Sequence, residues 1–366
     1  MRVGATWSSS ITIAPNNHNF PASQLTTGPN LPTRDLAAVM AGIYGSAPGC
    51  LCTFPNSPAC PGMQGKGEKY GQIATTIARA GRGYAGTYNY FDPDNFFSMT
   101  ALIYSGEPFL LEQARTVIER SGSWLCIGAV EKNQTCTYGQ LPHHFAGTTP
   151  TFLALSGATQ TGPNTFWTKS ALQYARNSGN MAWLKSYMPT LRAAAAFCFD
   201  LIDKENHLLL APGSLMIDVF IRGNYTLDSN AMIVGFLNEF ADAEEAIGNA
   251  TGATALRTEA TAMATAVNKY LWDTDHYVTQ VDPGDMDCAT THSCRDFVDY
   301  DSNLIAVAHE VGTIEQGKKT LKRIDTGCTG SHDRCAVQKC SAMYEGGKGG
   351  PQWTSEIWCK KTRDLP

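Results

Sequence analysis

The sequence lacks the features that mark several large classes of protein. No apolar run approaches the roughly 18 residues that a membrane span requires, so we expect no membrane insertion. Lysine and arginine total 28 against 33 aspartates and glutamates, which leaves a formal net charge of −5. This balance provides no basic surface for nucleic acid, and we expect no nucleic-acid partner. With 43% hydrophobic and 17% charged residues, the composition is that of a folded globular protein.

Common catalytic signatures are also missing. The sequence contains no Gly-x-Ser-x-Gly elbow, no Walker phosphate loop and no His-Glu-x-x-His zinc motif. Residues 81–86 match the glycine spacing of a dinucleotide fingerprint, but no strand precedes them and no strand–helix–strand pattern surrounds them. Asp92 and Asp94 suggest calcium, yet the roughly twelve-residue loop of an EF-hand does not follow. We therefore expect no cofactor and no metal.

Cysteines are plentiful, and they favour a secreted or lumenal protein. Most of the 12 fall in local groups within turn-rich sequence: Cys50, Cys52 and Cys60; Cys126 and Cys136; Cys288 and Cys294; and Cys328, Cys335, Cys340 and Cys359. We expect local disulfides at 126–136 and 288–294. Cys198 is expected to be a buried free thiol on an apolar helix face. Zinc at Cys328, Cys335 and Cys340 is the alternative, although their spacing fits no common zinc pattern.

Glycosylation sequons also favour passage through the secretory pathway. Asn133, Asn224 and Asn249 each begin an Asn-x-Ser/Thr sequon, as expected of a glycoprotein. No apolar segment of the kind found in signal peptides follows the charge of Arg2. We therefore expect the chain to be a mature or excised part of a longer secreted precursor.

Paired amphipathic helices dominate the rest of the chain. Apolar residues at helical spacing predict hairpins of residues 94–104 with 108–120, 164–177 with 181–203, 228–247 with 253–272, and 302–311 with 314–324. Weaker patterns predict helices at 35–44 and 70–80, and residues 277–281 are the best candidate for a strand. Asp228 and Asp301 are expected to be helix N-caps. Gly248 is expected in the left-handed conformation that ends a helix.

The connections between these helices predict the architecture. Short turns join the members of each hairpin, whereas the long loops 121–163, 204–227 and 273–299 join successive hairpins. We predict an all-α (α/α)6 toroid, complete or lacking one hairpin, with the long loops at one end and the site among them. An irregular segment, residues 1–68, is expected to pack on a catalytic domain at 69–366. A plain solenoid would show a sequence repeat, and we found none.

Several segments resemble the (α/α)6-barrel, or six-hairpin, glycosidases, a superfamily that includes processing α-glucosidases, trehalases, glucoamylases and α-L-rhamnosidases. The segments are Tyr90–Phe96, Phe166-Trp167 with residues 171–184, Ser214–Asp218 with Ser229–Ala231, and residues 299–306. The resemblance spans about residues 85–360. It implies an inverting glycoside hydrolase acting on an oligosaccharide or glycoconjugate, with the acid in a central loop and the base near the C-terminal end of the barrel.

Inverting hydrolysis needs one protonated and one ionised carboxyl group. Asp218 is the candidate acid, because its apolar neighbours, among them Met216 and Phe220, would favour the neutral carboxyl group. The alternative for Asp218 is a turn or cap residue. Glu356, between Trp353 and Trp358, is the candidate base, and its alternative role is a helix cap. Asp299 and Asp301 are the competing candidates for the base.

Other residues of these segments are expected to bind substrate. They are Asp92, Asp94, His144, Trp167, Arg222, Arg295, Asp299 and Trp353. Carboxylates accept hydrogen bonds from paired sugar hydroxyl groups, and tryptophan faces stack on sugar C–H faces. Helix capping by Asp94 and ordinary salt bridges by the arginines are the alternatives. The adjacent His143 and His144 cannot both point one way from a helix or strand, so we expect no joint metal site.

Two other functions remain open at this point. A polysaccharide lyase uses the same toroid and abstracts a proton with tyrosine or histidine, but it requires a basic cleft, which the net acidity does not favour. A non-catalytic carbohydrate-binding protein would keep the fold and lack the base. A test for the release of monosaccharide from candidate substrates would distinguish the hydrolase from the lyase and from the binding protein.

Overall fold

The computed structural model describes residues 9–10, 26–27, 51–52, 72–73, 89–127, 136–146, 149–154, 156–210, 213, 215–216, 225–292 and 299–328. The chain forms two compact units that alternate along the sequence. Unit one comprises Met1–Cys126, Leu141–Thr151 and Phe166–Thr190, and unit two comprises Ile127–Gln140, Phe152–Thr165 and Leu191–Pro366.

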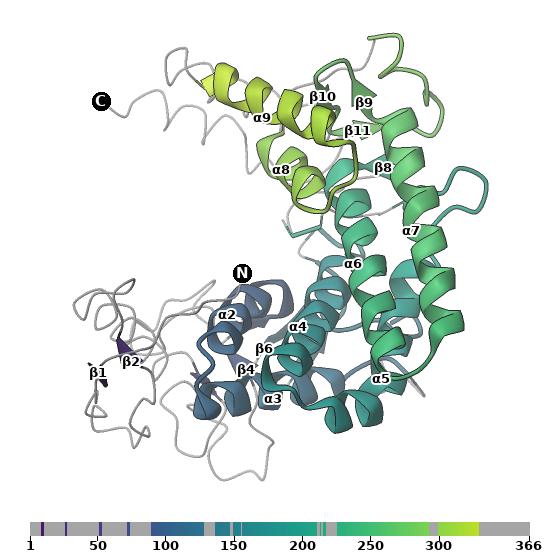
Figure 1. Ribbon diagram of the computed structural model, residues 1–366. Helices are drawn as coiled ribbons and strands as arrows, with labels where there is room; N and C mark the ends of the chain where they lie inside the picture. The colour runs from purple at the N-terminus through teal and green to yellow at the C-terminus, as the bar shows by residue number, and fades with distance from the viewer. Residues whose placement is uncertain are drawn as a thin grey trace, which may run out of the picture. The chain divides into compact units, whose positions relative to one another are not determined.

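The described helices occur in the expected pairs. They are α2 (Asp92–Tyr104) with α3 (Pro108–Gly122), α4 (Gly162–Ser178) with α5 (Met181–Phe199), α6 (Leu227–Ala246) with α7 (Ala250–Tyr270), and α8 (Tyr300–Ala308) with α9 (Ile314–Cys328). All four predicted hairpins are confirmed (Figure 1). The predicted end of α5 at residue 203 is wrong, because Ile202 leaves the helix to form an antiparallel bridge with Leu209.

Short strands accompany these helices. They are β1 (Ser9–Ser10), β2 (Thr26–Thr27), β3 (Leu51–Cys52), β4 (Gln72–Ile73), β5 (Asn89–Phe91), β6 (His144–Ala146), β7 (Thr149–Thr151), β8 (Tyr225–Thr226), β9 (Trp272–Asp273), β10 (His276–Tyr277) and β11 (Gln280–Val281). The helix expected at 70–80 is wrong at residues 72–73, which pair with β3. The expected strand at 277–281 is divided between β10 and β11. The helix expected at 35–44 and most of segment 1–68 lie outside the described residues, so the domain boundary at residue 68 stays a prediction.

Unit one is held together by an aromatic core. Trp183 stacks on Tyr187 with ring centroids 5.0 Å apart, and Tyr174 meets Trp183 edge-on at 4.8 Å. The indole N–H of Trp167 donates to the backbone carbonyl of Ile118 at 2.9 Å, which ties α4 to α3. A hydrogen-bonded indole can be buried without losing hydrogen-bond energy. The aromatic cluster therefore packs α3, α4 and α5 together, and the bond from Trp167 fixes the position of α4 on α3.

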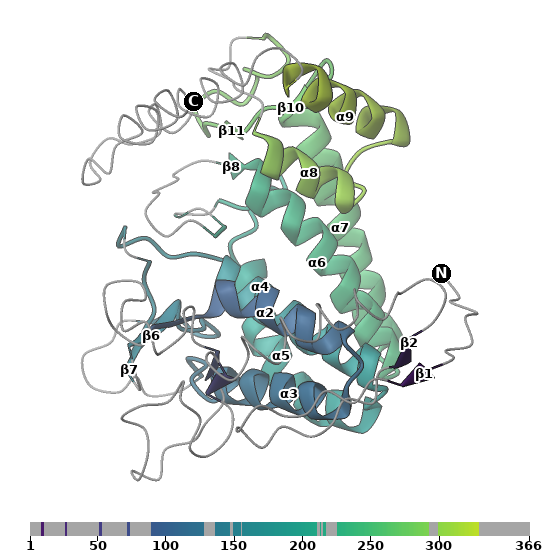
Figure 2. The same ribbon diagram turned by 90° about the vertical axis from the view of Figure 1, so that its left-hand side faces the viewer.

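In unit two, α6 is the inner helix and α7 the outer one. Residues 229–237 of α6 are buried without interruption, which means that the helix is packed on every side. By contrast, α7 buries a single stripe: Ala253, Ala260, Met263, Ala266 and Val267. The two helices lie side by side in both views (Figures 1 and 2). Gly248 ends α6 with φ at +95°, as expected.

A three-residue motif recurs at the start of α6 and of α8. Asp228-Ser229-Asn230 and Asp301-Ser302-Asn303 occupy the same positions in the two helices, and each asparagine side chain bonds to backbone groups that precede its helix. Asn230 accepts from the N–H of Leu209 (2.7 Å) and donates to the carbonyl oxygens of Leu209 (3.0 Å) and Thr226 (2.8 Å). The two helix starts therefore share this tripeptide, which is far shorter than the repeat of a solenoid.

The second copy of the motif makes the same contacts. Asn303 accepts from the N–H of Tyr277 (2.9 Å) and donates to the carbonyl oxygens of Tyr277 (3.0 Å) and Asp299 (3.0 Å). Both asparagines are fully buried. Hairpin α4–α5 is thus followed by the bridge between Ile202 and Leu209, and hairpin α6–α7 by the strand pair β9–β10. In both cases one buried asparagine bonds the start of the next hairpin to that bridge or strand pair.

A bidentate ion pair links α5 to α6 within unit two. The Nε and Nη2 atoms of Arg192 each lie 2.7 Å from a carboxylate oxygen of Glu244, whose side chain is only 4% exposed, and Asn249 donates a further bond at 2.9 Å. Burial alone would raise the pKa of Glu244. The hydrogen bonds from Arg192 and Asn249 and the charge of Arg192 outweigh burial, so that pKa is lowered.

We expect Glu244→Gln to destabilise the protein by about 2 kcal/mol at pH 7, because the half-exposed guanidinium loses its partner while remaining partly screened by solvent. The pKa of Glu244 is lower in the folded protein than in the unfolded chain, where it is near 4.5, so the ionised carboxylate stabilises the fold above that pH. This stabilisation is lost as the pH falls through the pKa of the folded state. Denaturant unfolding should show the difference from wild type shrinking below about pH 4. Glu245→Gln, which breaks an exposed pair with Arg257, is the control and should change stability by less than about 1 kcal/mol at either pH.

Gly139 is required for two separate reasons. Its φ is +76°, and a Cβ atom there would lie 2.1 Å from the backbone carbonyl oxygen of Ala193. Gly106 also has a positive φ (+70°), but a Cβ atom there would meet nothing within 4 Å. Both positions require the left-handed conformation, but only at buried Gly139 would a Cβ atom also collide with the backbone.

We expect Gly106→Ala to cost about 1 kcal/mol of unfolding free energy, the price of a left-handed alanine. Gly139→Ala should cost about 3 kcal/mol or more, since the backbone of α5 must also move. Urea titrations of both variants test this. Equal losses at the two positions would contradict the close approach of Gly139 to α5.

Candidate functional site

The long loops 204–227 and 273–299 meet at the N-terminal end of α6. Strands β8 and β11 pair antiparallel, with Thr226 opposite Gln280 and Tyr225 opposite Val281. The backbone N–H of Leu227 donates to the carbonyl oxygen of Thr279 at 2.8 Å. For these two loops the predicted convergence is confirmed, and loop 121–163 remains a prediction because its residues are divided between the units.

Asp228 anchors the first of these loops. One carboxylate oxygen accepts from the N–H of Leu215 at 3.3 Å, and the other accepts from the N–H of Ser229 at 2.7 Å. The expected role of Asp228 as N-cap is wrong, because Thr226 occupies that position and Asp228 lies in the first turn. A carboxylate there is favoured by the positive end of the helix dipole. The carboxylate of Asp228 therefore holds the loop at Leu215 and also stabilises the start of α6.

Several expected site residues lie outside the described part of the chain: Asp218, Arg222, Arg295, Trp353 and Glu356. The described residues on either side of Asp218 and Arg222 are nevertheless informative. Leu215 is held by Asp228, and Tyr225 belongs to β8. The described residues on both sides of the segment that carries Asp218 therefore lie at the N-terminal end of α6.

Asp299 lies at the equivalent end of α8, where it is the N-cap residue. Its carboxylate accepts a hydrogen bond from the hydroxyl group of Ser302, and the carboxylate makes no cap bond to the backbone. The expected cap, Asp301, is instead an exposed residue of the first turn, in the position that Asp228 has in α6. The expected capping role of Asp301 is therefore wrong.

In unit one, the sheet β5–β6–β7 brings together segments that are distant in sequence. Phe91 is paired with His144, and His144 is paired with Thr151 (Figure 2 shows β6 and β7). Because α2 begins at Asp92, immediately after β5, the backbone of Asp92 lies beside the strand that carries His144. Asp94 follows within the first turn and is exposed. These three predicted residues therefore belong to one region of unit one.

The structure does not support a substrate-binding role for Trp167. Its side chain is 0% exposed, so its faces are covered by protein and the expected sugar contact is wrong. An exposed aromatic ring is available on α2 instead. Phe97 is 52% exposed, packs edge-on against Phe96 at 5.2 Å, and lies three residues after Asp94, on the same face of the helix. The spacing of Asp94 and Phe97 could have identified this pair from the sequence.

His143 and His144 form a pair of facing imidazoles. Their Nδ1 atoms are 2.9 Å apart and the ring planes are perpendicular. Our expectation that adjacent histidines point apart is therefore wrong for these rings. His143 is only 2% exposed, and burial, with the charge of His144 as a smaller cause, lowers its pKa to about 3. Burial also lowers the pKa of His144.

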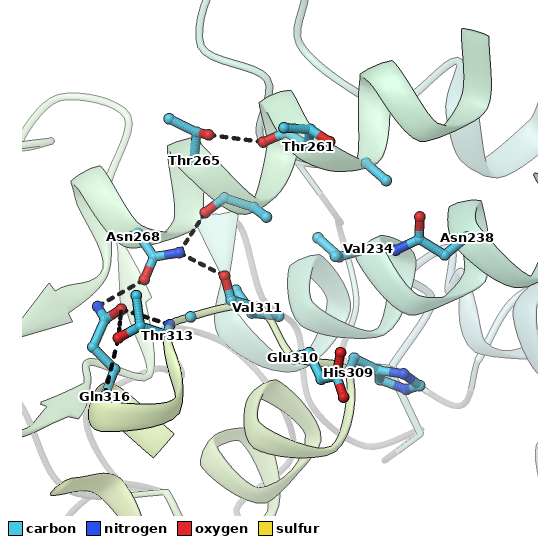
Figure 3. Close-up of a pocket in the computed structure, with 13 residues that line it drawn as sticks. Val234, Asn238, Thr261, Thr265, Asn268, His309, Glu310, Val311, Thr313 and Gln316 are labelled. Carbon is cyan, nitrogen blue, oxygen red and sulfur yellow. Dashed lines mark hydrogen bonds between the residues drawn. The ribbon is translucent and has the colours of Figure 1, made fainter. Parts of the chain in front are cut away.

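One cavity of about 550 Å³ lies in unit two, between α6, α7 and the turn from α8 to α9 (Figure 3). Most of its amide groups are already bonded to one another. Asn268 donates to the carbonyl oxygen of Val311 at 2.7 Å and accepts from Gln316 at 2.8 Å. Gln316 in turn accepts from Thr313. None of the predicted site residues lines this cavity, and we assign it no role.

The cysteines agree in part with expectation. Cys126 and Cys136 form a disulfide, as predicted, and Cys198 is a buried free thiol whose pKa burial raises to about 12. Cys288 is also disulfide-bonded. Cys294 lies outside the described residues, so the 288–294 pairing stays a prediction. Among the described helices, none is long and apolar enough to cross a membrane.

Comparison with known proteins gives structural likeness only. No family model matches the sequence, and no curated protein matches it. A GH78 family rhamnosidase of Bacillus sp. GL1 is similar in structure at 16% identity, with a TM-score of 0.50 over 66% of this chain and 24% of that chain. A rhamnosidase from Klebsiella oxytoca with rhamnose bound has 15% identity and a TM-score of 0.47 over 65% and 42%.

A sugar epimerase from a ruminal bacterium has 10% identity and a TM-score of 0.46 over 76% of this chain and 73% of that chain. This chain spans less than half of the length of either rhamnosidase. The likeness to the Bacillus enzyme shows the fold. It is a mostly helical (α/α)6 toroid of hairpins, as the sequence predicted.

Proposed function

We propose that this protein is an inverting glycoside hydrolase acting on an oligosaccharide or glycoconjugate. The observation that carries the proposal is the anchoring of the segment around Asp218. Asp228 holds one side of it through Leu215, and pairing of β8 with β11 holds the other. The eight residues 217–224 span at most about 28 Å when fully extended, and the described residues on both sides of them are held at the N-terminal end of α6.

In this proposal Asp218 is the general acid and Glu356 the general base. Both belong to the part of the chain that forms unit two. An inverting pair is separated by about 6.5–9.5 Å, which leaves room for the attacking water. The acid protonates the leaving oxygen as the glycosidic bond breaks, and the base removes a proton from the water that attacks the anomeric carbon from the opposite face.

Asp299, from the start of α8, is proposed to bind a sugar hydroxyl group in the same unit, together with Arg222, Arg295 and Trp353. In unit one, Asp92, Asp94 and His144 are proposed as hydroxyl-binding groups, and the exposed ring of Phe97 as a platform for a sugar face. The fold shared with a rhamnosidase makes a carbohydrate the favoured ligand. The disulfides support a secreted or lumenal location.

Release of monosaccharide tests the proposal directly. The protein is incubated with a panel of oligosaccharides and aryl glycosides, and proton NMR identifies the anomer that forms first. We expect hydrolysis with inversion at the anomeric carbon. Hydrolysis with retention would contradict the mechanism, an unsaturated product would indicate a lyase, and saturable sugar binding without turnover would indicate a binding protein.

A further inference from the structure

The turn between α6 and α7 contains a glycosylation sequon whose asparagine also has a structural role. In Asn249-Ala250-Thr251 the asparagine is partly exposed, and the two residues after it are exposed. Gly248, which precedes the sequon and ends α6, is exposed as well. A sequon that carries a glycan must lie in a surface segment, and this turn is one.

Asn249 is the N-cap of α7. Its side-chain oxygen Oδ1 accepts a hydrogen bond from the backbone N–H of Gly252 at 3.1 Å. Its amide nitrogen Nδ2 donates at 2.9 Å to Glu244, the buried partner of Arg192. Gly252 permits this arrangement, because a Cβ atom there would lie 2.3 Å from Nδ2. The amide of Asn249 therefore stabilises the start of α7 and also supports the ion pair that joins α5 to α6.

Attachment of a glycan is chemically compatible with both of these bonds. Glycosyl transfer forms a bond between Nδ2 and the anomeric carbon of the first sugar, breaks the bond from that carbon to a lipid-linked diphosphate, and releases one proton from Nδ2. The product keeps Oδ1 and one hydrogen on Nδ2. An asparagine amide has two N–H donors, and among the described groups only Glu244 accepts from Nδ2. One hydrogen can therefore be replaced while the other still donates to Glu244.

We propose that Asn249 carries an N-linked glycan and, with the glycan attached, remains both the N-cap of α7 and the partner of Glu244. The turn lies at the end of α6 opposite to β8 and β11 (Figure 1). Helix α6 has 20 residues, which at about 1.5 Å per residue places Asn249 roughly 30 Å from Asp228. The glycan therefore leaves the proposed substrate site unobstructed. The inference rests on the proposed secretory location and not on the proposed hydrolysis.

Two substitutions separate the glycan from the hydrogen bonds. Thr251→Ala removes the sequon and leaves the side chain of Asn249 unchanged. Asn249→Asp also removes the sequon and keeps an oxygen that can cap α7. Its second oxygen replaces the N–H group, however, and would face the carboxylate of Glu244, which it repels. If Asn249 only provides a sequon, the two variants should be equally stable. If its amide also bonds to Glu244, the aspartate variant should be the less stable one.

The first measurement is the occupancy of Asn249 in the full chain, secreted from a eukaryotic cell with an added signal peptide. Mass spectrometry of the peptide that contains residue 249 shows whether it carries a glycan. We expect Asn249 to be occupied in wild type and unmodified in Thr251→Ala. An unmodified Asn249 in the secreted wild-type protein would overturn the proposal. The added signal peptide supplies the location, so this result does not depend on where the natural protein resides.

The second measurement is the melting temperature at pH 7 after two enzymatic treatments of the glycosylated protein. An endoglycosidase leaves the first sugar on Nδ2 and so keeps the N–H group that donates to Glu244. An amidase removes the whole glycan and converts Asn249 to aspartate. We expect the amidase-treated protein to melt at least about 2 °C below the endoglycosidase-treated one, and Asn249→Asp to melt below Thr251→Ala by a similar amount.

The same treatments of Thr251→Ala are the control, because only the sequons at Asn133 and Asn224 can respond there. The two treatments should give melting temperatures within about 1 °C of each other in this variant. Equal melting temperatures in treated wild type, or a difference of the same size in Thr251→Ala, would overturn the bond from glycosylated Asn249 to Glu244.

Discussion

Asp218→Asn is expected to slow the release of sugars from natural substrates by at least about 100-fold, the lower end of what a general acid contributes. Asparagine keeps the shape and polarity of the side chain but cannot deliver a proton to the leaving oxygen. Activated aryl glycosides need less protonation, so their loss should be much smaller. Steady-state kinetics on a series of leaving groups measures the difference as a slope.

Glu356→Gln should instead lower turnover for every leaving group, because water activation fails whichever group departs. Asp242→Asn is the matched control for the loss of one carboxylate in unit two. Asp242 is an exposed partner of Arg257 at 2.9 Å, and its variant should retain the wild-type rate. A wild-type rate in Asp218→Asn on a natural substrate would rule out Asp218 as the acid.

Asn230→Asp is expected to destabilise the protein by at least about 3 kcal/mol, one of the two largest effects on stability that we predict. The carboxylate could still accept from the N–H of Leu209. Its second oxygen would replace an N–H donor and would face the carbonyl oxygens of Leu209 and Thr226, at 3.0 and 2.8 Å in the wild type. A fully buried charge would then be left with two repelling neighbours.

Asn238→Asp is the matched control on the same helix. Asn238 is exposed, at the rim of the cavity in Figure 3, and its charge would remain solvated, so the change should be within about 0.5 kcal/mol. Thermal unfolding of both variants measures the difference. If Asn303→Asp is as damaging as Asn230→Asp, the two copies of the motif have the same structural role, and a mild effect of either would contradict that equivalence.

The helical hairpins could be predicted from sequence because local signals agreed with the tertiary packing. Gly248 in the left-handed conformation ends α6, as expected, and the short turn at Gly106 joins α2 to α3. Where local signals competed, the predictions were wrong. Asp228 looked like an N-cap because an apolar run follows it, but its carboxylate bonds to Leu215, thirteen residues before it in sequence, and no local pattern shows that bond.

Burial was the second property that the sequence concealed. Trp167 and Phe97 are both aromatic residues on helices, but one is fully buried and the other is half exposed. The difference depends on which helices pack against each face, which is set by contacts distant in sequence. The facing imidazoles of His143 and His144 arise in the same way, since the hydrogen bond from His143 to Thr151 in β7 helps to set their geometry.

The sequence by itself determined the hairpin class of the fold and the positions of the long loops, because helix periodicity and turn residues are local properties of the chain. Only the tertiary structure decided which residues are drawn together: loop 204–227 to loop 273–299 through β8 and β11, and His144 to the start of α2 through β5 and β6. The physical reason is that strand pairing and burial depend on partners far away in sequence, whose backbone groups must be satisfied when water is excluded.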